Sequence, residues 1–162
     1  MASTESRLFD VAQYTALGAW AALAVAPRTT VARAVTAATL VGCSGVYAFL
    51  IARGMTTEPM PEASLATLGG VRELLQGSGP ATHAACWVHY LAFDLGMGLF
   101  EAELAGRLEL PQAALWLSLP LTLMLGPIGL LTFCALAAGH AAWQGRLEDT
   151  VSGLLSSGRK RD

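Results

Sequence analysis

The chain of 162 residues is 54% hydrophobic and only 14% charged, and its formal net charge at neutral pH is −2. Soluble domains have about 25% charged residues, so this composition is untypical of a soluble protein. No basic patch of the kind that binds nucleic acid occurs, and we expect no nucleic-acid partner. The apolar residues form long runs, which indicates an integral membrane protein in contact with the lipid bilayer.

The first two apolar segments run from about Leu8 to Ala26 and from Val31 to Arg53. Small residues in the second segment, among them Gly42 and Gly45, suit close contact between helices. We predict that both segments cross the membrane as α-helices. The cysteines lie inside apolar runs without metal-ligand spacing, so we expect buried thiols at Cys43, Cys86 and Cys134.

The connection from residue 54 to 80 begins with prolines and polar residues, which discourage regular structure. Leu65, Leu68, Val71 and Leu75 then follow at near-helical spacing, with Ser64 as the candidate N-cap. We predict a short amphipathic helix that lies at the membrane interface. Two roles stay open for it: a plain linker, or a lid over a cavity that opens toward the cytoplasm.

The third segment, from Ala81 to Ala105, contains WVHYLAFDL, where His89 and Asp94 interrupt an apolar run. Residues three, four and seven apart share one face of a helix, so Trp87, Tyr90 and Asp94 lie on the same side. His89 lies about 140° away around the helix. A charged side chain at the bilayer centre costs about 2.5–3.5 kcal/mol on insertion scales, so we expect Asp94 to face the bundle interior.

Two interpretations of His89 and Asp94 stay open. In the functional one they are a proton acceptor and donor that flank a dry cavity. In the structural one they form hydrogen bonds that hold helices together. His83 and Glu101 lie nearer the ends of the segment, where solvation at the membrane interface explains them. No ligand spacing supports a metal site, and we expect none.

The fourth segment, residues 111–143, contains LTLMLGPIGLL. Pro127 has no N–H and its ring clashes with the carbonyl four residues back, that of Leu123. We therefore predict a single span with a kink at Pro127. We expect this kink to face Asp94, because a freed carbonyl within a membrane must be satisfied by protein or by water in a cavity.

The four segments predict an all-α fold: a four-helix transmembrane bundle over residues 1–146, with the short interfacial helix between its second and third spans. A polar, basic-ended tail follows at residues 147–162. With four spans, seven of the ten Lys and Arg residues flank the side that holds both ends of the chain. Because such residues collect in the cytoplasm, we expect both ends there, with the protein in a bacterial cytoplasmic membrane.

WVHYLAFDL, followed by LTLMLGPIGLL, resembles the small four-span membrane proteins of the abscisic-acid-deficient-four-like family. The tripeptide Ala-Pro-Arg at residues 26–28 and the segment LATLGGVRELL also fit this family. The resemblance covers about residues 8 to 140. The family includes the plant factor required for making neoxanthin, so the resemblance implies a role in carotenoid metabolism.

The reaction implied by the resemblance converts the epoxy-carotenoid violaxanthin to allenic neoxanthin. It is a redox-neutral isomerisation that needs an acid, a base and a dry cavity, and it implies no cofactor. Asp94 and His89 are the catalytic candidates. The substrate-binding candidates lie on the third and fourth segments and are Trp87, Tyr90, Phe93, Met97 and Pro127.

One residue departs from the family pattern. Leu99 stands where the family has an arginine. This difference favours an alternative in which the protein is not an enzyme and binds a pigment or lipid, or serves as an accessory subunit of a carotenoid enzyme. A homo-oligomer is also open. A proton relay or small transporter is a third interpretation, since an intramembrane Asp and His suit that role as well.

Overall fold

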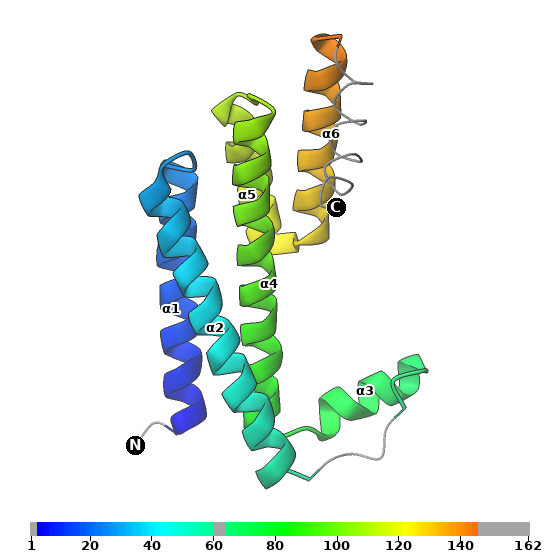
Figure 1. Ribbon diagram of the computed structural model, residues 1–162. Helices are drawn as coiled ribbons and strands as arrows, with labels where there is room; N and C mark the ends of the chain where they lie inside the picture. Colours follow the sequence, from blue (N-terminus) through cyan, green and yellow to red (C-terminus); the bar gives the residue numbers. More distant parts are fainter. Residues whose placement is uncertain (1–2, 60–63, 146–162) are drawn as a thin grey trace, which may run out of the picture. The chain divides into compact units, whose positions relative to one another are not determined.

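The computed structural model describes residues 3–59 and 64–145 (Figure 1). These residues form six α-helices and no strand, which confirms the predicted all-α class. The chain divides into two compact units, Met1–Gly96 and Met97–Asp162, and the boundary falls inside helix α4 (Pro80–Arg107). The tail predicted at residues 147–162 lies outside the described residues.

The first unit begins with a hairpin of two helices, α1 (Thr4–Val25) and α2 (Thr30–Thr57). Thr29 caps α2, because its side chain accepts a hydrogen bond from the backbone N–H of Ala32. At the open end of the hairpin, Arg53 Nε lies 2.6 Å from Glu5 Oε1. This ion pair joins the last turns of α2 to the first turn of α1, as antiparallel packing requires.

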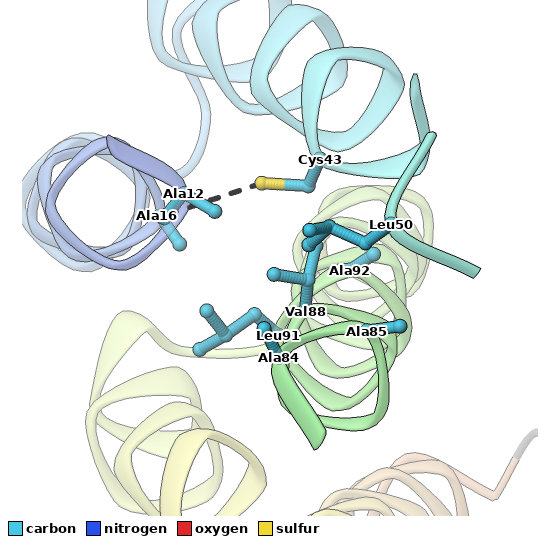
Figure 2. Close-up of a cluster of buried hydrophobic side chains, with 9 residues drawn as sticks. All are labelled: Ala12, Ala16, Cys43, Leu50, Ala84, Ala85, Val88, Leu91 and Ala92. Atoms are coloured by element: carbon cyan, nitrogen blue, oxygen red, sulfur yellow. Dashed lines mark hydrogen bonds between the residues drawn. The ribbon is translucent and has the colours of Figure 1, made fainter. Parts of the chain in front are cut away.

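The core of the first unit is built mainly from small side chains, and Figure 2 shows part of it. Ala12 and Ala16 of α1 face Cys43 of α2, whose Sγ lies 4.0 Å from the carbonyl oxygen of Ala12. The first half of α4 contributes Ala84, Ala85, Val88, Leu91 and Ala92. Because most of these residues are alanines, the helix backbones approach closely.

The prediction of three buried thiols is confirmed only for Cys43. Cys86 and Cys134 are exposed, so the prediction is wrong for these two. An apolar run in the sequence does not show which face of the helix packs against a neighbouring helix. All three cysteines are free.

Helix α3 (Leu68–Gly77) confirms the short helix predicted after the second span. Its N-cap is Thr67, which accepts a hydrogen bond from the backbone N–H of Gly70 at 3.1 Å, and not Ser64. His83 Nε2 donates to the carbonyl oxygen of Leu75 at 2.7 Å and ties α3 to the start of α4. The location of α3 at a membrane interface stays a prediction.

Glu58 follows the last residue of α2 and reaches the first turn of α4. Its Oε1 accepts from the backbone N–H of Ala81 at 2.6 Å, and its Oε2 accepts from the hydroxyl of Thr82 at 2.7 Å. Desolvation raises the pKa of the Glu58 carboxyl, but these hydrogen bonds together outweigh it and leave the pKa below its usual value. Glu58 therefore caps α4 as a carboxylate.

The second unit replaces the single kinked span expected over residues 111–143 with two helices. These are α5 (Gln112–Leu125) and α6 (Pro127–Trp143), which runs antiparallel to α5 (Figure 1). The chain reverses at Gly126, whose φ of 39° is rarely adopted by residues other than glycine. Pro127 then begins α6, because its missing N–H costs nothing at the first position of a helix.

Among the described helices, α1 and α2 are long and apolar enough to cross a membrane. Large apolar side chains, including Val25, Val31 and Val41, are exposed on them. This exposure suits contact with lipid and supports association with a membrane. The predicted bundle of four membrane-spanning helices goes beyond this finding, because α4 is not among these candidate spans and α5 and α6 are shorter helices.

We predict that Glu58→Gln lowers the stability of the protein at neutral pH and flattens its pH dependence. The pKa of Glu58 in the folded state lies below the unfolded value of about 4.3. Its stabilisation is therefore full above that unfolded value and is lost as the pH falls through the folded value. Loss of a helix cap costs about 0.5–2 kcal/mol.

Thermal unfolding in detergent, followed from about pH 7 to about pH 3, measures this effect. The matched control is Glu73→Gln, which changes an exposed carboxyl of α3. Parallel pH profiles for the two variants and the unmodified protein would contradict the role given to Glu58.

Candidate functional site

One face of the first half of α4 carries a row of aromatic and acidic side chains, as its helical spacing predicted. The ring centroid of Trp87 lies 5.4 Å from that of Tyr90 on the next turn and 6.2 Å from that of Phe9 on α1. The indole Nε1 of Trp87 donates to Gln13 Oε1 at 2.6 Å. Helix α1 therefore orients the indole, and the indole packs against the phenol ring.

Asp94 is the next residue of this row, and only 8% of its surface is exposed. The hydroxyl of Tyr90 is a hydrogen-bond partner of its carboxyl group. The other oxygen, Oδ2, is buried and has no hydrogen-bond partner in the described part of the chain. Leaving a buried acceptor unpartnered costs about 1–3 kcal/mol, so this atom is a candidate for contact with a ligand.

His89 occupies a different face of α4 and is exposed. Its ring stacks on Phe93, with centroids 4.5 Å apart, and lies 5.3 Å from the ring of Tyr47 on α2. The contacts of His89 are thus aromatic and exposed, whereas those of Asp94 are buried. The two catalytic candidates do not meet, in keeping with the angle of about 140° between them, and their roles stay predictions.

The other predicted binding residues differ in their surroundings. Phe93 is 66% exposed and joins the stack with His89. Met97 is half-buried on the following turn of α4. Pro127 is exposed at the start of α6. The orientation expected for the break at Pro127, toward Asp94, stays a prediction, as do the binding roles.

In the second unit, Glu101 is completely buried, and it is the functional candidate that sequence reasoning missed. Its Oε2 accepts from the hydroxyl of Ser118 at 2.8 Å, and its Oε1 accepts from the hydroxyl of Thr122 at 2.7 Å. Both hydroxyls belong to α5. The interpretation of Glu101 as an interfacial, solvated residue is therefore wrong.

A signal for this contact was present in the fourth apolar segment. Ser118 and Thr122 are four residues apart, so they lie on one face of a helix whose other residues are almost all apolar. Two hydroxyls on one face predict a polar partner on a neighbouring helix. The partner itself could not be deduced, because the break at Gly126 changes how much of the segment lies beside α4.

A groove of about 350 Å³ lies between α1 and α2. Its walls are apolar or small, and they are formed by Val11, Ala12, Thr15, Ala38, Thr39, Gly42, Cys43 and Val46. A side-chain carbon added at Gly42 would meet no other atom within 4 Å, so the floor of the groove is open there. Such a surface can accept part of an apolar chain.

Residues 7–133 match the family described as ABA DEFICIENT 4-like. This range includes WVHYLAFDL and LTLMLGPIGLL, the two motifs on which the resemblance rested, and it confirms that resemblance. No curated protein and no solved structure matches the chain.

We predict that Glu101→Ala destabilises the protein more than Glu103→Ala does. The first change leaves the buried hydroxyls of Ser118 and Thr122 without their acceptors, at about 1–3 kcal/mol each. Glu103 lies half-buried on the same helix and pairs with Arg107, 3.2 Å away, so its loss is expected to cost less than about 1 kcal/mol. Glu101→Gln is expected to fall between the two, since an amide can accept from one hydroxyl and donate to the other.

The midpoint of thermal unfolding in detergent, compared among the three variants, measures this ranking. Equal midpoints for Glu101→Ala and Glu103→Ala would show that the buried contact with α5 does not stabilise the second unit.

Proposed function

Because the chain belongs to the ABA DEFICIENT 4-like family, we propose that it isomerises a carotenoid or a similar isoprenoid lipid within a membrane. In this proposal α1, α2 and α4 cross the bilayer, and the substrate reaches α4 from the lipid. The proposed reaction is of the type that opens an epoxy-carotenoid, such as violaxanthin, to an allenic product.

This reaction is an exchange of protons without oxidation or reduction. The C–O bond of the epoxide breaks and its oxygen takes up a proton, while a C–H bond near the end of the polyene breaks and releases a proton. Substrate and product are therefore isomers. The protein must supply one group that gives a proton and one that accepts a proton.

The buried Oδ2 of Asp94, which has no hydrogen-bond partner in the described residues, is the observation that carries the proposal. A carboxyl group gives a proton when it is protonated and accepts one when it is ionised. Tyr90 is the hydrogen-bond partner of this carboxyl, and we assign it to orient the group or to relay a proton. The rings of Trp87 and Phe9 continue the apolar surface next to Tyr90.

We assign His89 a separate position from Asp94. Its stack with Phe93 and its contact with Tyr47 form an exposed aromatic face, which suits contact with the conjugated chain of a carotenoid. In the proposal Phe93, Met97 and Pro127 contact the same kind of apolar chain. One proton is taken up and one is released, so the reaction needs no oxidant or reductant. In the proposal no cofactor takes part.

The groove between α1 and α2 favours a second function, in which the protein holds an isoprenoid or pigment without converting it. Leu99, in place of the arginine of the family pattern, is consistent with the loss of a group that positions substrate. A protein of this kind would act as an accessory subunit of a carotenoid enzyme or as a homo-oligomer.

We predict that Asp94→Asn lowers product formation by about 100-fold or more, because general acid–base catalysis contributes about 10²–10⁴-fold. The measurement is the yield of allenic carotenoid, separated by chromatography, from cells that make violaxanthin and express the protein. Asp94→Glu keeps the carboxyl group and is expected to retain part of the activity.

Asp10→Asn is the matched control, since it removes an exposed carboxyl of α1 and should leave the yield unchanged. Each variant is compared at equal protein level and with a single peak in size-exclusion chromatography. Full yield from Asp94→Asn would remove Asp94 from the mechanism. An unchanged carotenoid that co-purifies equally with Asp94→Asn and with the unmodified protein would favour the binding function.

A further inference from the structure

Helices α5 and α6 pack closely beside the turn at Gly126. A side-chain carbon at Gly129 of α6 would overlap the backbone and hydroxyl of Thr122 on α5, so the two helices touch at this point. Glu101 accepts hydrogen bonds from Ser118 and Thr122, which holds α5 against the last turns of α4. The chain therefore runs down α5 and back along α6, so that α6 ends on the side of this unit where α4 ends (Figure 1).

The turn itself is compatible with an apolar environment. Gly126 is buried, its N–H donates to the carbonyl of Thr122 at 2.9 Å, and its carbonyl accepts from the N–H of Leu130 at 3.1 Å. Pro127 has no N–H to satisfy. Irregular backbone is tolerated at membrane depth when its polar groups are satisfied by the protein in this way.

The lengths of the two helices are short for complete crossings. With 14 residues, α5 is about 21 Å long, and with 17 residues α6 is about 26 Å long. The hydrocarbon core of a bilayer is about 30 Å thick. Both helices, as described, are shorter than this thickness.

The exposed side chains of the hairpin include large apolar residues around the turn and a tryptophan near each open end. The exposed side chains around the turn are apolar: Met124, Leu125, Ile128 and Leu131. Trp116 lies near the start of α5 and Trp143 at the end of α6, and both are exposed. Exposed tryptophans collect at membrane–water interfaces, so the open end of the hairpin fits an interface and the turn fits hydrocarbon.

We propose that α5 and α6 form a re-entrant hairpin, which enters and leaves the bilayer on the same face. This inference rests on the part of the proposed function in which α1, α2 and α4 cross the membrane. The number of crossings is then odd, so the start of α1 and the end of α6 lie on opposite faces. The expectation that both lie in the cytoplasm assumed a single span where the hairpin stands.

The distribution of Lys and Arg indicates which face of the membrane is cytoplasmic. The face with the segment before α1 and the connection from α2 to α4 carries Arg7, Arg53 and Arg72. On the opposite face the described part of the chain carries Arg28, Arg33 and Arg107, and the sequence that follows it contains Arg146, Arg159, Lys160 and Arg161. Because Lys and Arg collect in cytoplasmic segments, the end of α6 lies in the cytoplasm and the start of α1 lies outside.

Cysteine labelling of the full chain tests this arrangement. Cys43→Ala, Cys86→Ala and Cys134→Ala provide a background without cysteines. Single cysteines are then introduced at exposed positions in the first turn of α1, between α2 and α3, in the first turn of α6 next to the hairpin turn, and after α6, by Ser6→Cys, Ser64→Cys, Ile128→Cys and Gln144→Cys. A maleimide that does not cross membranes is added to right-side-out and to inside-out vesicles.

The expected result is labelling of Ser6→Cys and Ser64→Cys in right-side-out vesicles only, and of Gln144→Cys in inside-out vesicles only. Ile128→Cys should react at least about tenfold less than the others in both, because a maleimide in water does not reach hydrocarbon. Labelling of Ser6→Cys and Gln144→Cys from the same side would overturn the odd number of crossings. Labelling of Ser6→Cys only in inside-out vesicles, and of Gln144→Cys only in right-side-out vesicles, would overturn the assigned orientation.

Efficient labelling of Ile128→Cys in right-side-out vesicles would overturn the re-entrant hairpin and show two complete crossings. Gly106→Cys, which is exposed near the end of α4, is the matched control and should follow Gln144→Cys. Each variant must elute as a single peak in detergent. The labelling pattern does not depend on carotenoid conversion, so a failure of the proposed isomerase activity and a failure of this inference are separate results.

Discussion

Carboxyl groups placed beside apolar helices need hydrogen-bond donors, and two carboxyl groups meet this requirement by joining a neighbouring segment to α4. Glu58 takes its donors from the first turn of α4 and so ties the end of α2 to it. Glu101 takes its donors from two hydroxyls of α5. Asp94 has the phenol of Tyr90 at one side of its carboxyl, while its Oδ2 has no donor among the described residues. The first two groups therefore stabilise packing, and Asp94 is the group on which the proposed function rests.

Much of this arrangement follows from local rules. Helical spacing correctly placed Trp87 and Tyr90 on one face, and it separated His89 from Asp94. The sequence also predicted an all-α fold and the family. These features depend on the period of the helix and on motifs, both of which are readable in a single chain.

Features that depend on long-range packing were not predictable. In a sequence, a proline after a glycine is compatible both with a kinked helix and with a complete reversal of the chain. The close contact of Gly129 with Thr122 shows that the chain reverses here, and this contact is visible only in the folded structure. Glu101 looked like a solvated residue, because the hydroxyls that bury it lie 17 and 21 residues further along the chain. Cys86 and Cys134 lie in apolar runs, yet both are exposed on their helices.

The proposed reaction moves protons and leaves the oxidation state of the carotenoid unchanged, in an apolar, helical protein. Its most direct test is the mass and identity of the product that the purified protein makes from violaxanthin in detergent, in the dark and without oxygen. The account predicts an allenic isomer with the same mass as the substrate, formed at a rate proportional to the amount of protein. A product of changed mass, or recovery of the unaltered substrate alone, would contradict it.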